Sequence, residues 1–156
     1  MTERPSFARQ QRRATGDVVV DGLLSGLPAG AAMGVFLVVM GLVGGVGPGK
    51  MLGRFDPTGQ GSPLTGLLIH LAVSGLYGVG LAVLVHILGG RWANWRRYGW
   101  LLGAAYGLLV WVVAQFVLLP RLGIALADDI SPAQFIPAHL IYGIMLGYIL
   151  GRHQSA

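Results

Sequence analysis

The sequence contains no cysteine among its 156 residues. This absence excludes disulfide bonds, thiolate metal sites and iron–sulfur clusters held by this chain alone. Charged residues are also scarce, at 11% of the chain, whereas soluble domains carry about a quarter. So few charges cannot cover a water-exposed surface, and the composition therefore indicates a surface that faces lipid.

Motifs for catalysis are missing as well. The sequence has no Ser/His/Asp set, Walker loop, HExxH motif or pair of carboxylates within an apolar segment, so we expect no enzymatic activity. We expect no metal site, because no carboxylate lies near the two histidines of the apolar segments. Nucleic-acid binding is not expected either, because the basic residues of the first 16 positions form a short tail rather than a folded reader.

What the chain does contain is long apolar stretches, and crossing a bilayer takes about 20 such residues. Four stretches qualify: Gly22–Val46, Leu64–Leu88, Gly99–Leu119 and Ala133–Leu150. Proline stands at several of their boundaries, as expected where helices stop and start. The sequence therefore predicts an all-α integral membrane four-helix bundle. Residues 17–156 would form a single transmembrane domain after a basic tail at 1–16.

The basic residues are distributed unevenly between the two sides of this bundle. Eight of the 11 lie in the N-terminal tail, in the connector at 89–98 and near the C-terminus. Basic residues concentrate in cytoplasmic loops. We therefore predict a multi-pass protein of a bacterial-type inner membrane, with both termini in the cytoplasm.

The second and fourth apolar stretches share a pattern. Pro63 precedes His70 by seven residues, and Pro132 precedes His139 by seven. Each histidine is followed by leucine, and small residues stand four and eight positions beyond it. The repetition predicts two helical hairpins in tandem that arose by duplication, with chance similarity as the alternative.

Glycine is abundant, at 26 residues, and in several stretches it recurs every fourth position. This spacing places glycines on one helix face, where they let two backbones approach closely. The main interpretation is packing within the bundle, and the alternative is a seam for a partner subunit or a flat cofactor. The residues concerned are Gly22, Gly26, Gly30, Gly34, Gly103, Gly107, Gly143 and Gly147.

Two histidines carry the candidate chemistry. His70 and His139 lie at similar distances from the helix starts, about 10 Å below the outer interface at 1.5 Å per residue. Ionisable groups inside a membrane usually face the bundle interior. Gln115 falls at a similar depth in the third stretch. We predict one polar layer near the outer surface, formed by these three residues together with Ser74, Tyr77 and Tyr142.

Three functions remain open from the sequence. The leading hypothesis is a non-catalytic structural or accessory subunit that packs through its glycine faces, with lipid, other membrane subunits or a second copy as partners. The second is a membrane cytochrome whose b-type haem is ligated by His70 and His139. The third is a small oligomeric transporter that uses the histidine and glutamine layer, since histidine titrates near neutral pH.

Overall fold

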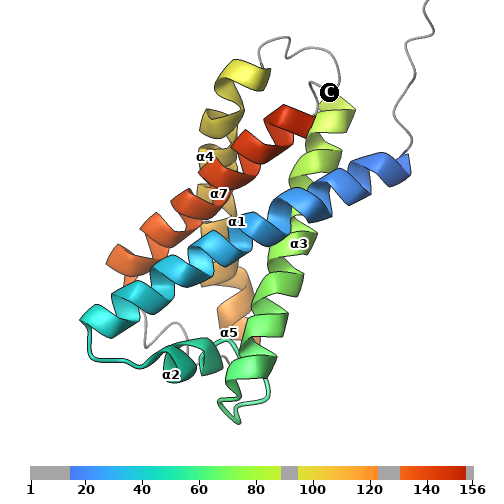
Figure 1. Cartoon of the computed structure of the whole chain (residues 1–156). Helices are drawn as coiled ribbons and strands as arrows, with labels where there is room; N and C mark the ends of the chain where they lie inside the picture. The colour runs from blue at the N-terminus through green and yellow to red at the C-terminus, as the bar shows by residue number, and fades with distance from the viewer. Residues whose placement is uncertain (1–14, 89–94, 123–130, 154–156) are drawn as a thin grey trace, which may run out of the picture.

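A computed structural model describes residues 15–88, 95–122 and 131–153 (Figure 1). Within these ranges the chain is helical and has no strand. Four helices are long and apolar enough to cross a membrane: Thr15–Val43, Pro63–Leu88, Arg97–Arg121 and Gln134–Arg152. The predicted all-α membrane bundle is confirmed, and the chain is a multi-pass membrane protein. Most of the basic tail predicted at 1–16, and parts of the connectors at 89–98 and 120–132, lie outside the described residues.

The helices begin and end where the local sequence dictates. The second and fourth spanning helices, α3 (Pro63–Leu88) and α7 (Pro132–His153), both begin at proline, which suits the first helical position because that residue needs no N–H partner. The first, α1 (Thr15–Val43), starts earlier than the predicted Gly22 and ends before the predicted Val46. Gly45 ends it with a φ of +77°, while the N–H of Val46 bonds the carbonyl oxygen of Gly41 at 2.8 Å.

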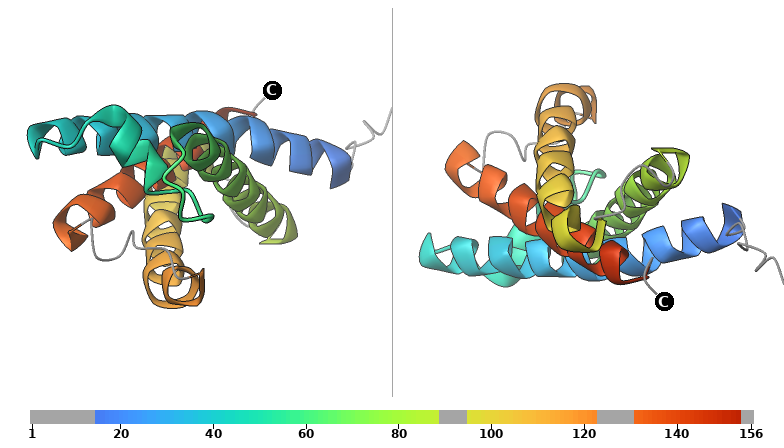
Figure 2. Two further views of the ribbon diagram at one scale, coloured as in Figure 1. Left: turned by 90° about the horizontal axis from the view of Figure 1, so that it is seen from below. Right: turned by 90° about the horizontal axis from the view of Figure 1, so that it is seen from above.

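The spanning helices form two antiparallel hairpins. In the first, α1 packs against α3, and in the second, α4 (Trp95–Val113) packs against α7. The hairpins meet where α1 crosses α7, whereas α3 and α4 make little contact with each other. The two end-on views show α3 and α4 splaying apart from this junction (Figure 2). The third span continues beyond α4 through a π-helical turn, η1 (Ala114–Leu118), and a short helix, α5 (Leu119–Leu122).

Glycines lie at the crossing within each hairpin, and the two crossings have the same register. A Cβ atom added to Gly78 would lie 2.7 Å from Gly26 Cα and would also meet the carbonyl oxygen of Gly22. A Cβ atom added to Gly147 would lie 2.8 Å from Gly103 Cα and would also meet the carbonyl oxygen of Gly99. Gly78 and Gly147 each stand eight residues after the histidine of their helix.

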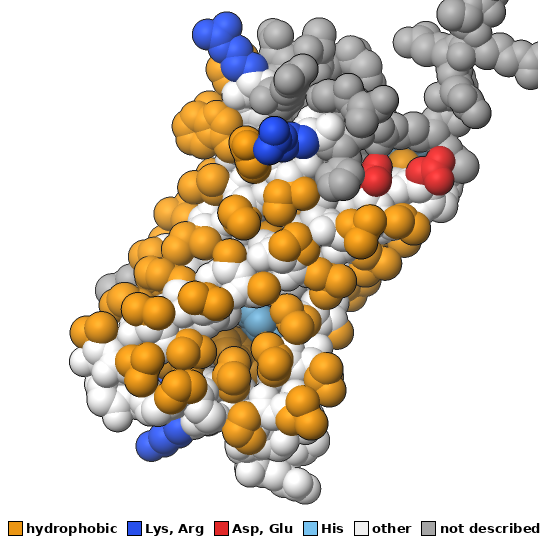
Figure 3. Space-filling view, in the orientation of Figure 1, with side chains coloured by type: hydrophobic (Ala, Val, Ile, Leu, Met, Phe, Trp, Pro, Cys, Tyr) orange, Lys and Arg blue, Asp and Glu red, His pale blue; other side chains and the backbone are white. Residues whose placement is uncertain are grey.

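The outer surface of the bundle is apolar. Large hydrophobic side chains such as Val35, Leu76 and Phe116 are 64–69% exposed. On the face shown in Figure 3, hydrophobic side chains cover the middle of the molecule, while basic and acidic side chains gather at its ends. Such a band is too large for a water-soluble surface and matches a lipid-facing one.

The connector between α1 and α3 is folded rather than extended. It contains a short helix, α2 (Pro48–Gly53), which packs against both neighbours. In the turn that follows, the carboxylate of Asp56 accepts hydrogen bonds from the Thr58 N–H at 3.0 Å, the Thr58 hydroxyl at 2.7 Å and the Ser62 N–H at 2.9 Å. The backbone N–H groups of Thr58 and Ser62 are the largest causes that hold the pKa of Asp56 below its ordinary value of 3.8.

Candidate functional site: a cavity between the two hairpins

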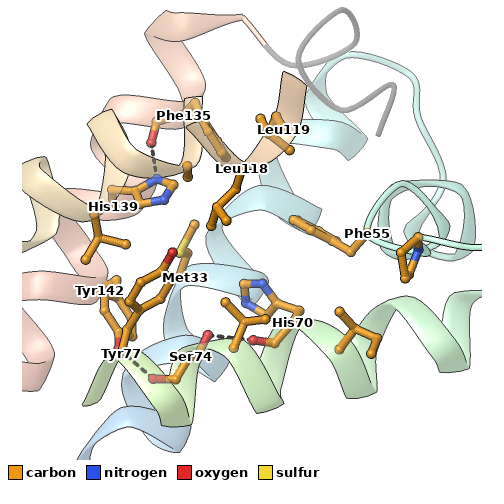
Figure 4. Close-up of a pocket in the computed structure, with 15 residues that line it drawn as sticks. Met33, Phe55, His70, Ser74, Tyr77, Leu118, Leu119, Phe135, His139 and Tyr142 are labelled. Atoms are coloured by element: carbon orange, nitrogen blue, oxygen red, sulfur yellow. Dashed lines mark hydrogen bonds between the residues drawn. The ribbon is translucent and has the colours of Figure 1, made fainter. Parts of the chain in front are cut away.

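A cavity of about 310 Å³ lies between the hairpins, and both predicted histidines line it. Its wall takes side chains from α1, α3, α4, η1, α5 and α7, and from the connector after α2. Figure 4 shows His70 and His139 on different sides of the space, with Met33 and Leu118 between them. The volume is at the lower end of the range for small-molecule sites, which spans about 300–1,000 Å³.

His70 belongs to α3 and is buried, at 8% exposure. Its Nε2 atom lies 2.9 Å from the carbonyl oxygen of Gly30 in α1. The ring also lies against Gly34 of α1, where an added Cβ atom would be in ordinary van der Waals contact with the same Nε2 at 3.5 Å. The ring of Phe55 packs against the His70 ring with centroids 4.8 Å apart. The first hairpin and its connector therefore fix the orientation of this imidazole.

His139 belongs to α7 and is also buried, at 4% exposure. Its Nδ1 atom lies 2.9 Å from the carbonyl oxygen of Phe135, one turn earlier in the same helix. The Phe135 ring meets the imidazole edge to face, with centroids 4.4 Å apart. Unlike the contacts of His70, both of these contacts come from the histidine's own helix.

The remaining polar groups of the cavity bond mostly to backbone. The Ser74 hydroxyl donates to the carbonyl oxygen of His70 at 2.7 Å, and the Tyr142 hydroxyl donates to the carbonyl oxygen of Ser74 at 2.6 Å. Tyr77 also lines the cavity, and its own carbonyl oxygen accepts a hydrogen bond from the Tyr106 hydroxyl at 2.8 Å. Three residues of the predicted polar layer therefore line the same cavity as the two histidines: Ser74, Tyr77 and Tyr142.

Gln115 is not among the residues that line the cavity. It lies half-buried in the π-helical turn, whereas its neighbours Ala114 and Leu118 face the space. Such turns are rare and often occur near functional sites. Pro120 follows closely and cannot donate a helix hydrogen bond, which accounts for irregular backbone at this point. The prediction that Gln115 shares the histidine layer assumed a regular helix, and a π turn changes which side chains face inward.

The cavity reaches the side of the bundle. Ile69 and Val73 both line it, yet each is 40% exposed on the outer surface of α3. The facing wall comes from Val110 and Ala114, and their helix makes little contact with α3. A gap between these two walls therefore faces the region that lipid occupies.

Sequence reasoning did not identify the apolar wall of this cavity, and Phe55 and Met33 are two examples. Phe55 is the one large aromatic residue in the polar connector at 47–63, and an isolated aromatic of this kind is a usable signal for a loop that folds back. Met33 stands in the uniformly apolar second half of α1, where neither periodicity nor polarity distinguishes it from its lipid-facing neighbours.

The residues present do not fit a haem held by two histidines. The Nε2 atom of His70, at the outer end of the ring, is committed to the Gly30 carbonyl oxygen. Only Nδ1 remains, next to the side-chain stem, and the Phe55 ring already packs against this imidazole with centroids 4.8 Å apart. Among the described residues, no three His, Cys, Asp or Glu side chains gather as a metal cluster.

Comparisons of the chain with protein-family models, with curated proteins and with solved structures found no match. The cavity is therefore interpreted from its own chemistry.

Proposed function

We propose that this small polytopic membrane protein binds a lipid-soluble small molecule in the cavity between its hairpins, without catalysing a reaction on it. The observation that carries the proposal is that His70 and His139, from separate hairpins, line one cavity. Ligand sites are typically concave and mostly apolar, with a few fixed polar groups. Here those groups are the two imidazoles and the hydroxyls of Ser74, Tyr77 and Tyr142.

The route to the cavity supports a ligand from the bilayer. The partly exposed rim residues Ile69 and Val73 face lipid rather than water, so an apolar molecule can arrive sideways without crossing a polar surface. A binding role is favoured over catalysis because, among the described residues, no carboxylate lines the cavity to orient either imidazole as a base.

The glycine faces fit this function as intramolecular packing. Gly22 and Gly26 lie against α3, and Gly103 and Gly107 lie against α7. We propose that close approach within each hairpin leaves the space between hairpins open. In that role the glycines are covered by the chain itself, which disfavours the alternative in which they bind a partner subunit.

We further propose that the two hairpins are a duplicated unit. The shared register of the crossings supports this, because Gly26 relates to Gly78 as Gly103 relates to Gly147. The excess of basic residues at the two ends and in the connector at 89–98 supports cytoplasmic termini in a bacterial-type inner membrane. In that orientation the histidine cavity lies nearer the outer side.

A small apolar photoprobe tests the binding proposal. The protein is reconstituted in lipid nanodiscs with trifluoromethyl-phenyldiazirine, irradiated, and mapped by peptide mass spectrometry. We expect labelling at Met33, a lining residue that is only 6% exposed, in excess of that at the lipid-facing Leu76. Ala114→Phe fills the cavity and should remove this excess. Ala105→Phe, the same substitution on the exposed face of α4, is the matched control and should preserve it.

A second arm needs no variant. Excess unlabelled toluene should compete at the cavity residues and leave the labelling of Leu76 unchanged. The proposal is overturned if cavity and lipid-facing residues are labelled alike in the wild-type protein, or if toluene lowers both equally.

A further inference from the structure

The hydrogen bonds of the two histidines determine which ring nitrogen carries the proton. His70 Nε2 and His139 Nδ1 each lie 2.9 Å from a backbone carbonyl oxygen. A carbonyl oxygen only accepts hydrogen bonds, so each of these nitrogens must be the donor. His70 is therefore protonated at Nε2, and His139 at Nδ1.

The other nitrogen of each ring is consequently a lone-pair acceptor. A neutral imidazole has one N–H group, and a charged one would be uncompensated here, because the described lining residues include no acidic side chain. Nδ1 of His70 and Nε2 of His139 thus accept hydrogen bonds. The Nδ1 atom of His70 is next to the side-chain stem, on a ring that packs against Phe55, whereas Nε2 of His139 is at the outer end of its ring, over the cavity (Figure 4).

Most donors of the cavity are already used. The Ser74 hydroxyl hydrogen bonds the His70 carbonyl oxygen, and the Tyr142 hydroxyl hydrogen bonds the Ser74 carbonyl oxygen. Tyr77 keeps a hydroxyl that both donates and accepts. That single hydroxyl can supply only one of the two imidazole lone pairs, so at least one of them lacks a donor on the wall, and leaving a buried polar group unpaired is costly.

We infer that the cavity selects a lipid-soluble alcohol or phenol, whose hydroxyl group donates to Nε2 of His139. This inference rests on the proposed function and names the chemical class of its ligand. The apolar part of the molecule lies against Met33, Leu118 and the other apolar wall residues. Ketones, ethers and hydrocarbons lack the donor, so they leave the lone pair of His139 unpaired and bind less tightly.

Two matched photoprobes test whether the cavity prefers a ligand with a hydroxyl group. One is trifluoromethyl-phenyldiazirine with a ring hydroxyl, and the other carries a methyl group of similar size at the same position. Labelling at the buried Met33 is divided by labelling at the lipid-facing Leu76, so that a difference between the probes in partition into lipid cancels. One net hydrogen bond corresponds to a preference of about three- to tenfold for the hydroxyl probe.

His139→Phe tests the acceptor directly. Phenylalanine has a similar ring, and the Phe135 carbonyl oxygen keeps its helix hydrogen bond when the imidazole is removed. The hydroxyl preference should disappear in this variant. The exposed His86 of the same chain provides the matched control, and His86→Phe should retain the preference.

The wild-type protein supplies a measurement that needs no variant. In ¹⁵N NMR spectra of the histidine rings, an acceptor nitrogen moves to lower frequency when it receives a hydrogen bond. Adding 4-butylphenol should shift one such resonance, whereas adding 4-butyltoluene should not.

The outcomes separate the two proposals. Equal cavity labelling by both probes leaves the proposed binding intact and overturns the proposed preference for hydroxyl donors. A hydroxyl preference that survives His139→Phe overturns it as well. An absence of cavity labelling by either probe overturns the proposed function itself. Histidine ¹⁵N resonances that do not respond to 4-butylphenol also overturn the proposed preference for hydroxyl donors.

Discussion

The hydroxyl of Tyr142 donates a hydrogen bond to the backbone carbonyl oxygen of Ser74 at 2.6 Å. This bond joins the last helix to α3 across the two hairpins, at the wall of the cavity. A second tyrosine acts in parallel, because the Tyr106 hydroxyl of α4 donates to the carbonyl oxygen of Tyr77 in α3 at 2.8 Å. Both helices of the second hairpin therefore reach the same helix of the first, where direct contact between α3 and α4 is sparse.

Removing the first of these hydroxyls should loosen the junction between hairpins. We expect Tyr142→Phe to lower the free energy of unfolding by about 1 kcal/mol, the usual net contribution of an intramolecular hydrogen bond. Denaturation by sodium dodecyl sulfate in mixed micelles, followed by circular dichroism, measures this change. Tyr148→Phe is the matched control, because Tyr148 is 52% exposed and its hydroxyl only accepts from Arg152 on the surface. Equal effects of the two substitutions would contradict the structural role of the Tyr142 bond.

The glycine crossing of the second hairpin should not tolerate even a methyl group. In Gly103→Ala the new Cβ atom would lie 2.8 Å from Gly147 Cα and would also meet the carbonyl oxygen of Gly143. Both neighbours are backbone and cannot move aside, so we expect a loss of about 1–3 kcal/mol in the free energy of unfolding, as for other overpacked sites. The same denaturation assay measures it.

Gly16→Ala is the control for that substitution. Nothing lies within 4 Å of the Cβ atom it would add, and alanine has the higher helix propensity. This variant should unfold at the same denaturant concentration as the wild-type protein or a higher one. Unchanged stability of Gly103→Ala would show that the hairpin adjusts its helix separation.

Much of the fold could be predicted from the sequence alone. The four spans follow from the lengths of the apolar stretches, and Pro63 and Pro132 locate the starts of their helices. The inward position of His70 and His139 follows from the cost of exposing a polar ring to lipid. These predictions depend on local composition and regular helix geometry, and both hold in those segments.

The sequence is a weaker guide where the backbone departs from regular geometry or where a contact has no periodic signal. Gln115 was expected beside the histidines, but it lies in a π turn and does not line the cavity. Phe55 was missed because one aromatic residue in a polar connector produces no pattern. The start of α1 at Thr15 was also missed, because Asp17 and Asp21 interrupt the apolar stretch without ending the helix.

The stability of the folded connector that carries Phe55 should depend on pH. The pKa of Asp56 is lowered in the folded protein, chiefly by the N–H groups of Thr58 and Ser62, so its carboxylate stabilises the connector. That stabilisation is complete above the ordinary pKa of 3.8 and is lost as the pH falls from there through the lowered value. Hydrogen exchange of the Thr58 and Ser62 amides, corrected for the intrinsic rate at each pH, should show protection falling in that window.

Asp56→Asn isolates the charge as the cause. The amide cannot titrate, so protection of the same two amides should be weaker at neutral pH and should not change further in the acid window. A wild-type connector whose protection stays constant down to pH values well below 3.8 would contradict the role assigned to this carboxylate.

The orientation of the bundle is testable because the chain has no cysteine to interfere. Gln60→Cys places a thiol in the exposed turn between α2 and α3, and Gly16→Cys places one at the exposed start of α1. With cytoplasmic termini, a membrane-impermeant maleimide added to intact cells should label Gln60→Cys at once, and Gly16→Cys only after the membrane is permeabilised. The reverse pattern would place the histidine cavity near the cytoplasmic side. Its ligand would then enter from the inner leaflet, because the Ile69 and Val73 rim lies toward the Gln60 end of α3.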